Sequence, residues 1–280
     1  MKCLQLVVEY TSRSDEFHIP LISDMHLGNK HTDEKLITEI VERIRTDKQC
    51  PWWFNLGDMC EFISRRDWRF DQEELAPWAR DVGDLPRVER QRLIKYLAPI
   101  ANKCGALLEG NHEHQQYHKN DRDVYKTVAE ALHEHVPADD RHELCMGHRG
   151  FVNIRFRRMK QATSLPETWT MTLFLTHGNG GGRKSGGKAL RLEEISGYIE
   201  GVDVMAMGHV HTPQHIPLEK IRPTNGREAR HTLIHTIVVP GLCRDPRYAD
   251  EKDLRPVPIG YTNLVVTPDK RNIKVEMLIS

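Results

Sequence analysis

The chain of 280 residues lacks long apolar runs, paired cysteines and an excess of either charge. Its longest apolar stretches have the length of strands, far short of the roughly 20 residues of a membrane helix, and its N-terminus has no signal-peptide pattern. Its 6 cysteines are scattered without a C-x-x-C pair, which favours reduced thiols over a disulfide framework or a zinc knuckle. We therefore expect a soluble, cytoplasmic protein with no membrane partner.

The charges of the sequence are balanced. Lys and Arg together number 40, and so do Asp and Glu, so the formal net charge is zero. No overall field then draws the protein onto nucleic acid, and any basic contact must be local. This balance argues against a processive nuclease that tracks along duplex, because such an enzyme needs many phosphate contacts along a groove.

Hydrophobic patterns predict a layered α/β protein with mixed sheets. Strands dominate toward the C-terminus, where the turn-rich residues 268–272 predict a final hairpin. We expect one domain over residues 1–280, with insertions at 61–92 and 141–167, and within the latter residues 151–157 alternate as a strand does. Strand-like runs lie at 3–10, 19–22, 52–56, 106–108, 169–175, 202–207, 233–239, 262–266 and 273–278, and helical patterns at 33–46, 88–102, 124–135 and 189–199.

Five short polar motifs each follow one of these strand-like runs, so their side chains should gather where loops carry chemistry on a rigid scaffold. Asp24 and His26 are two residues apart, and an extended backbone would point both to one side, with Met25 toward the core. Gly57 lets the chain turn sharply before Asp58, whose carboxylate could then bridge two cations roughly 3.5–4 Å apart. The motifs are Asp24-Met25-His26, Gly57-Asp58, Gly110-Asn111-His112-Glu113, Thr176-His177-Gly178 and Gly208-His209-Val210-His211.

The donors in these motifs are all oxygen and nitrogen, without thiolate. Two Asp, one Asn and four His would serve as ligands, which is the inventory of a two-metal centre, and His112 is left over. Such donors suit two divalent ions, with Mn²⁺ the first expectation and Fe, Zn²⁺, Ni²⁺ or Mg²⁺ as alternatives.

Together the motifs resemble the complete signature of the calcineurin-like metallophosphoesterase superfamily, over residues 24–211. The resemblance implies a four-layer α/β/β/α sandwich of two mixed sheets, with a dinuclear metal centre at the C-terminal strand ends. It also implies that Asp58 is shared, that one metal is held in addition by Asp24, His26 and His211, and that the other is held by Asn111, His177 and His209. The second motif departs from the Gly-Asp-x-Val-Asp-Arg-Gly of protein Ser/Thr phosphatases, so the chain is more similar to the prokaryotic or phage-type phosphodiesterase and nuclease branches.

These features lead to the hypothesis of a metal-dependent phosphodiesterase acting on nucleotides, cyclic nucleotides or nucleic acid. A hydroxide shared by the two metals would attack phosphorus in line, and His112, beside Asn111 and Asp58 at the reacting centre, is the candidate general acid. The alternative role of His112 is to orient a ligand. The alternative functions are a phosphomonoesterase of the same superfamily and, in a different class, a binding protein that keeps the fold without catalysis.

A glycine-rich basic loop at residues 178–188 follows the fourth motif. Residues 182–188 imitate a phosphate-cradling G-x-x-x-x-G-K loop, but Ala189 stands where that loop needs a Ser or Thr for Mg²⁺, which argues against a nucleoside triphosphatase. We expect Arg183, Lys184 or Lys188 to bind substrate phosphates. The alternative is a surface loop with solvated charges.

Overall fold

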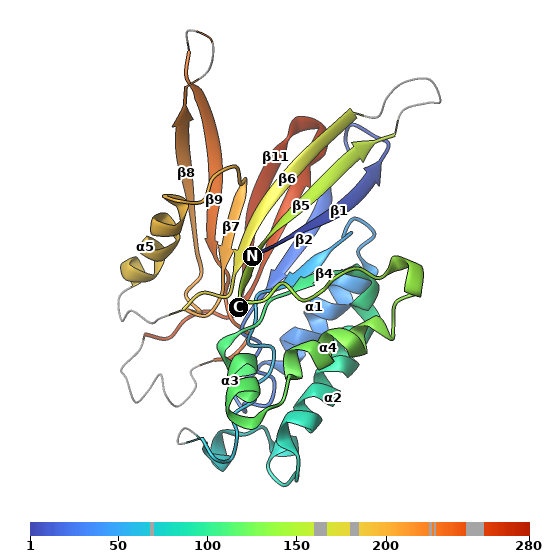
Figure 1. The fold of residues 1–280 in the computed structure, drawn as a ribbon, viewed down its shortest axis with the longest axis vertical. Coiled ribbons are helices and arrows are strands. Elements are labelled where there is room, and N and C mark those ends of the chain that lie inside the picture. Colours follow the sequence, from blue (N-terminus) through green and yellow to red (C-terminus); the bar gives the residue numbers. More distant parts are fainter. Residues whose placement is uncertain (68–69, 160–166, 180–184, 224–225, 227, 245–254) are drawn as a thin grey trace.

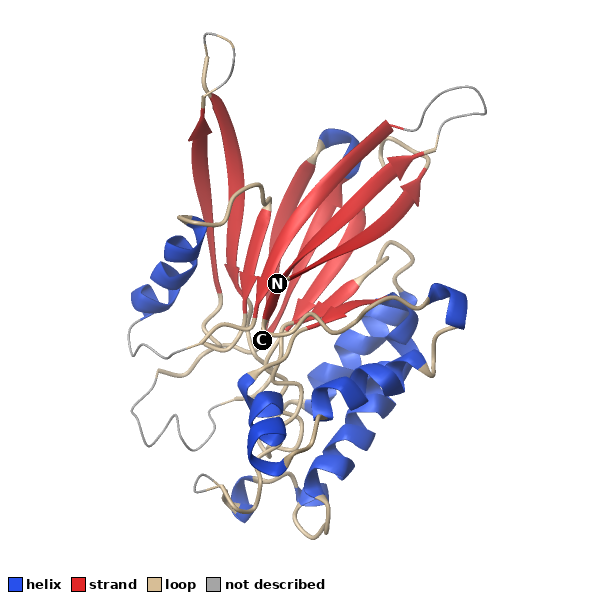
Figure 2. Cartoon of the chain, in the orientation of Figure 1, coloured by secondary structure: helices blue, strands red, loops and turns tan. Residues whose placement is uncertain are grey.

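Two mixed β-sheets form the centre of this computed structural model, which describes residues 1–67, 70–159, 167–179, 185–223, 226, 228–244 and 255–280 (Figures 1 and 2). The six-stranded sheet has the order β1 (Lys2–Tyr10), β5 (Arg149–Arg158), β6 (Glu167–Thr176), β7 (Val204–Met207), β9 (Arg230–Val238), β8 (Gln214–Arg222). The five-stranded sheet has the order β11 (Asn272–Ile279), β10 (Gly260–Thr267), β2 (Phe17–Ile22), β3 (Trp53–Asn55), β4 (Cys104–Leu107). Strands β10 and β11 pair antiparallel, which confirms the predicted C-terminal hairpin.

In the described part of the chain, the three largest apolar cores lie between four layers. The central core lies between the sheets and includes Phe54, Val152 and Leu264. A second core joins the five-stranded sheet to α1 (Glu34–Thr46), α2 (Leu85–Leu97) and α4 (Val124–His133), and a third joins the six-stranded sheet to α5 (Ser185–Ser196). The predicted α/β/β/α sandwich with two mixed sheets is therefore what the structure contains.

Helix α1 illustrates how local sequence produces these layers. The Asp33 side chain accepts a hydrogen bond from the Leu36 N–H at 2.9 Å, which satisfies one of the open donors at the helix start. The apolar face at Ile37, Ile40, Val41 and Ile44 is buried against the five-stranded sheet and the neighbouring helices. The expected helix at residues 33–46 is confirmed to within one residue.

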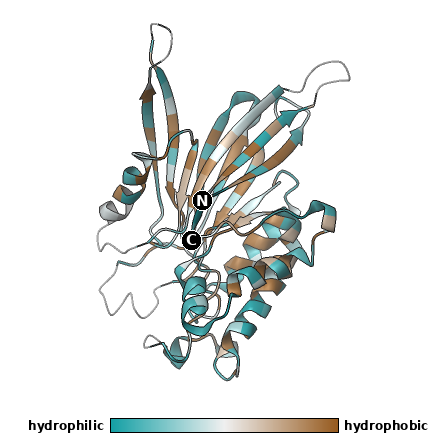
Figure 3. Ribbon diagram, viewed as in Figure 1, coloured by the Kyte–Doolittle hydropathy of each residue, from teal (hydrophilic) through white to brown (hydrophobic). Residues whose placement is uncertain are grey.

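Two elements of the structure, one helix and one strand, were not predicted from the hydrophobic patterns. Helix α3 (Asn111–Asn120) is polar throughout and is coloured as hydrophilic in Figure 3, so it has no apolar stripe at helical spacing. Strand β8 contains Pro217, which lacks the N–H of a ladder donor, and β8 lies at the edge of its sheet, where a proline is tolerated.

The described 3-10 turns are η1 (Gln72–Glu74), η2 (Pro77–Ala79), η3 (Ala98–Lys103), η4 (Ala138–Asp140) and η5 (Pro268–Lys270).

The two segments expected to be insertions differ in their structure. Residues 61–92 contain η1, η2 and the first part of α2, and there the Trp78 indole N–H donates to Glu34 of α1 at 2.7 Å. Trp68 lies outside the described residues. Residues 141–167 supply β5, the expected strand at 151–157, which lies between β1 and β6 inside the six-stranded sheet.

All five polar motifs follow strands as expected. Residues 24–26, 57–58 and 110–113 follow β2, β3 and β4 of one sheet, while residues 176–178 and 208–211 come at the ends of β6 and β7 of the other. Because both sheets present these strand ends at the same edge, the loops meet between the sheets and α3 (Figure 1). Among the described helices, none has the length and apolar character needed to span a membrane.

Candidate metal centre

Asp24, His26 and His211 form the first group of donor atoms. His211 Nε2 lies 3.1 Å from Asp24 Oδ1 and 3.3 Å from His26 Nε2, and all three side chains are buried. Two ligands that each lie about 2.1 Å from one cation are separated by about 3 Å. The group therefore has the spacing of side chains that share one ion.

Asp58, His177 and His209 form the second group, which Asn111 joins. His177 Nε2 lies 3.3 Å from Asp58 Oδ2 and 3.2 Å from Asn111 Oδ1, and the donor atoms of Asp58, His177 and His209 all lie within 4.8 Å of one another. The same Asp58 Oδ2 lies 4.0 Å from His26 Nε2 of the first group. Asp58 thus stands between the two groups, which is the position that a bridging carboxylate needs.

The backbone at these residues is not extended, and here the sequence-based expectation was wrong. Asp24 and His26 have φ values of +48° and +45°, and Asp58 has +50°. A left-handed conformation is uncommon for residues with a Cβ and is strained, and its clustering is typical of functional sites. Met25 is buried as expected, but Asp24 and His26 reach the same group through these turns, and His209 and His211 use positive φ values as well.

The orientation of the imidazoles is set by backbone carbonyls. His177 Nδ1 lies 2.7 Å from the Leu56 carbonyl oxygen, and His112 Nδ1 bonds to the Glu61 carbonyl oxygen. A carbonyl only accepts, so each Nδ1 is the donor and carries the proton. In a neutral ring Nε2 then keeps its lone pair, which for His177 faces Asp58 and Asn111.

Glu113 is a structural feature whose role the sequence reasoning missed. Its carboxylate accepts from the backbone N–H groups of Asp58 at 3.0 Å, Met59 at 2.7 Å and Gly110 at 2.9 Å. This holds the loop that carries Asp58 against the start of α3. The signal was present, because a Glu at the third position of a helix is the typical partner in a capping box. Burial, and then the nearby Asp58, raise the pKa of Glu113 to about 7.

Buried carboxylates and imidazoles balance each other in the site. Burial raises the pKa of Asp58, but His177 and His112 more than offset this, so the pKa lies well below its ordinary value. Burial also raises the pKa of Asp24, but His211 outweighs this effect, so the pKa of Asp24 is lowered as well. For His177, burial lowers the pKa, yet Asp58 outweighs it and raises the pKa to about 10. Divalent cations would take the place of such protons, since metal binding by imidazole releases them.

The donor set therefore fits a dinuclear metal site. It consists of carboxylate, amide and imidazole groups, most of them buried, and it contains no thiolate. The structure brings together all seven residues that the sequence singled out as ligands, and it places His112 beside them. The assignment of each residue to an ion stays a prediction.

The Gly110→Ala variant tests the close approach of the α3 start to Asp58. A Cβ at position 110 would lie 2.1 Å from Asp58 Oδ1 and 2.3 Å from the Asp58 backbone nitrogen, so the Asp58 loop must move. We expect a loss of about 1–3 kcal/mol in the free energy of unfolding and weaker metal binding, measured by denaturant unfolding and metal titration. The matched control is Gly83→Ala, where an added Cβ meets nothing within 4 Å and little change is expected. Equal stability of the two variants would contradict the packing described here.

Glu89 of α2 is a fully buried acid behind the site. Its Oε2 accepts from the Phe62 N–H at 3.1 Å, and among the described residues Oε1 has no hydrogen-bond partner. Burial, and then Glu61, raise its pKa well above the ordinary value of 4.5. The folded protein thus keeps a proton that the unfolded chain loses, and stability falls as the pH rises above 4.5 toward the folded-state pKa.

The Glu89→Gln variant should remove that pH dependence, because glutamine stays neutral. At pH 8 we expect its Tm to exceed that of the unaltered protein by about 2–4 °C, with the difference shrinking as the pH falls toward 4.5. Thermal unfolding across this pH range measures it. A Tm difference that does not change with pH would show that the carboxyl does not titrate in the way described.

The expected phosphate-binding residues are only partly described. Arg183 and Lys184 lie outside the described residues, and Lys188 is seen only as a position within α5. Their contact with substrate stays a prediction.

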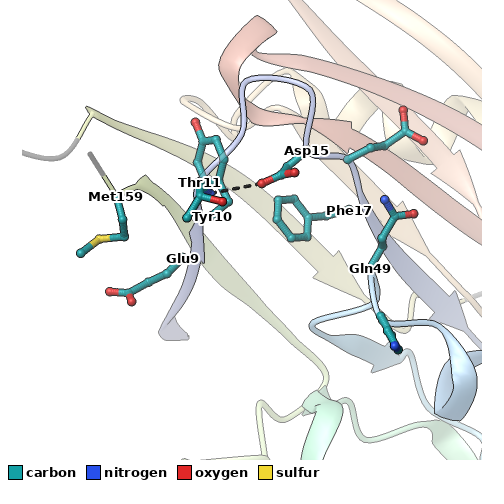
Figure 4. Close-up of a pocket in the computed structure, with 9 residues that line it drawn as sticks. Glu9, Tyr10, Thr11, Asp15, Phe17, Gln49 and Met159 are labelled. Carbon is teal, nitrogen blue, oxygen red and sulfur yellow. Dashed lines mark hydrogen bonds between the residues drawn. The ribbon is translucent and has the colours of Figure 1, made fainter. Parts of the chain in front are cut away.

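A separate cavity of about 420 Å³ lies away from this site (Figure 4). It is found at the start of β2, next to Phe17, whereas Asp24 follows the other end of that strand. At the rim of this cavity the Thr11 N–H donates a hydrogen bond of 3.1 Å to the Asp15 carboxylate. None of the predicted ligands lines this cavity, and we assign it no part in the chemistry.

Comparison with known proteins gives one family match. The model described as calcineurin-like phosphoesterase matches residues 17–213. A search of curated proteins gives no match. Similar solved structures include a metallophosphoesterase from Sphaerobacter thermophilus, with 15% identity, 94% of this chain and 88% of that chain covered, and a TM-score of 0.38. A predicted phosphoesterase from Streptococcus pneumoniae TIGR4 has 11% identity, coverage of 95% and 98%, and a TM-score of 0.34.

Proposed function

Because this chain belongs to the calcineurin-like phosphoesterase family, we propose that it hydrolyses phosphodiester bonds of nucleotides, cyclic nucleotides or nucleic acid. Membership of the family makes the chain a metallophosphoesterase. Beyond family membership, we propose a preference for diesters, the identity of the metals and a role for each side chain.

The observation that supports a diester is the charge around the candidate ligands. In the described part of the chain, the ion pairs of Asp24, Asp58 and Glu61 are all with histidines, and no Lys or Arg takes part. A phosphomonoester brings close to two negative charges into the site, whereas a diester brings one. Among the described residues around this centre, carboxylates are paired with imidazoles and no guanidinium balances a second phosphate charge, so this part of the site is better matched to the smaller charge.

The proposed ligands follow the two groups of donor atoms. Asp24, His26 and His211 hold one ion, Asn111, His177 and His209 hold the other, and Asp58 is shared. When bound, two divalent ions such as Mn²⁺ lower the pKa of water and neutralise charge on phosphoryl oxygens. The carbonyl of Leu56 keeps His177 in the tautomer that presents Nε2, and Glu113 fixes the Asp58 loop.

His112 is the proposed general acid. Its backbone N–H donates to Asp58 Oδ1 at 2.9 Å, and its ring packs edge-on to His26 with centroids 4.7 Å apart. The side chain is partly exposed, so a substrate can reach it. With the Nδ1 proton held by the Glu61 carbonyl, the proton that would pass to the leaving oxygen is the one that the cationic ring carries on Nε2, and the ring would be left neutral.

The proposal is tested by comparing hydrolysis of bis-p-nitrophenyl phosphate and p-nitrophenyl phosphate after loading with Mn²⁺, Zn²⁺, Ni²⁺ or Mg²⁺. We expect a higher kcat/KM for the diester. Preference for the monoester would overturn the diester assignment and leave a phosphomonoesterase. Inactivity of the metal-loaded protein on both esters would favour the non-catalytic alternative and call for nucleotide substrates to be tried.

A further inference from the structure

A second group of metal-ligand side chains lies on the surface next to the start of α3. Glu109 Oε1 is 3.1 Å from His114 Nδ1, and Glu109 Oε2 is 3.7 Å from His148 Nε2. The rings of His114 and His148 have centroids 4.6 Å apart. One donor atom from each of the three residues can be chosen so that all lie within 4.8 Å of one another.

The imidazole of His148 is held in one tautomer. Its Nδ1 lies 3.0 Å from the Glu109 carbonyl oxygen, which can only accept, so Nδ1 is the donor. Nε2 of the neutral ring is therefore the atom with a free lone pair, and this is the nitrogen that faces the Glu109 carboxylate. A hydrogen bond from the other ring nitrogen to a carbonyl is the usual support of a metal-ligating histidine.

His118 extends the group by one turn of α3. It follows His114 at the i, i+4 spacing, and the two rings have centroids 4.2 Å apart. Two histidines at this spacing on one helix face are a common metal-binding arrangement. Three imidazoles and one carboxylate thus come together from a loop, a helix and a turn.

We propose that Glu109, His114 and His148, with His118 beside them, bind a third divalent transition-metal ion, separate from the dinuclear centre. None of these four residues belongs to the two groups of donor atoms described above. Two imidazoles and a carboxylate with an open position are a known zinc-binding set, and Ni²⁺ also favours imidazole.

Such an ion would connect parts of both sheets. Glu109 follows β4 of the five-stranded sheet, His148 precedes β5 of the six-stranded sheet, and His114 lies on the helix that carries Asn111 and His112. The Glu109 N–H already donates to the Gly147 carbonyl at 3.0 Å, so the two segments are in contact at this point. The ion would fasten the start of α3 to this junction, and its binding should raise the stability of the fold.

The test is Zn²⁺ binding by isothermal titration to the metal-free full chain, with Tm as a second readout. The unaltered protein should bind three ions, and His148→Ala should bind two, with affinity at the third site lowered at least ~100-fold, since loss of a mere supporting partner already costs about 10–100-fold. The Tm increase produced by excess Zn²⁺ should be smaller in His148→Ala, while the metal-free Tm values agree. His135→Ala, an exposed histidine after α4, is the matched control and should behave as the unaltered protein.

Two results would overturn the proposal. Equal stoichiometry and affinity in His148→Ala and in the unaltered protein would mean that the four side chains are linked only by hydrogen bonds and ring contacts. The second such result is that the unaltered protein binds only two ions and that Asp58→Asn loses both. The four side chains would then bind no metal ion. Conversely, one ion that is sensitive to His148→Ala and insensitive to Asp58→Asn would support this site while contradicting the dinuclear centre.

Discussion

The Asp58→Asn variant should lose about 10³-fold or more in kcat/KM for a phosphate diester and should bind its metal ions far more weakly. Asp58 Oδ2 lies 3.3 Å from His177 Nε2 and 4.0 Å from His26 Nε2, so this carboxylate oxygen stands between both groups of donors. Asparagine keeps the size of the side chain but offers a neutral oxygen in place of a charged one. The expected loss of about 10³-fold in kcat/KM corresponds to about 4 kcal/mol of transition-state stabilisation.

A matched control for this variant is Asp33→Asn. Asp33 caps α1 through its side chain, and asparagine is an equally good cap, so the same chemical change is made outside the site. We expect this control to keep full activity and metal content. Full activity of Asp58→Asn with two bound ions would show that the charge of Asp58 is not needed and would remove it from the ligand set.

The His112→Ala variant should keep its metal ions and lose about 10²–10⁴-fold in kcat, the usual contribution of general acid catalysis. The hydrogen bond from His112 to Asp58 is donated by the backbone N–H, which alanine retains at that position. The loss should be greater for a diester with a basic alkoxide leaving group than for bis-p-nitrophenyl phosphate, because p-nitrophenolate departs with little need of a proton. Kinetics on the two diesters, with metal analysis, measure this.

The comparison of the two leaving groups distinguishes a general acid role of His112 from a role in orienting a metal ligand. If His112 only orients a ligand, alanine at this position should lower metal content and reduce hydrolysis of both diesters to the same degree. His135→Ala serves again as the histidine control, because His135 is exposed and follows α4. A uniform loss accompanied by depleted metal would therefore assign His112 to positioning.

The sequence was most informative where chemistry and strand ends coincide. The five motifs carry polar residues directly after apolar runs, and in a layered α/β protein such strand ends share an edge, which is why the predicted ligands meet. The layers were also predictable, because α1 and α4 have clear apolar faces and the strands alternate or are buried throughout.

Other features depend on contacts that a linear pattern does not carry. Helix α3 is stabilised by the Glu113 carboxylate and by its place at the end of β4, so its polar sequence contains no helical stripe to detect. The left-handed backbone at Asp24, His26 and Asp58 is imposed by the surrounding loops against the ordinary preference of these residue types. The neighbourhood of Glu109, His114 and His148 forms only when β4, α3 and β5 are assembled.

The most direct test of the two-metal account is the electron paramagnetic resonance spectrum of the protein loaded with two equivalents of Mn²⁺. Ions that share Asp58 would lie roughly 3.5–4 Å apart, and at that separation two Mn²⁺ ions interact magnetically. The account predicts the spectrum of a coupled pair, replaced by signals of isolated Mn²⁺ in Asp58→Asn. Isolated Mn²⁺ signals in the unaltered protein at two bound equivalents would contradict it.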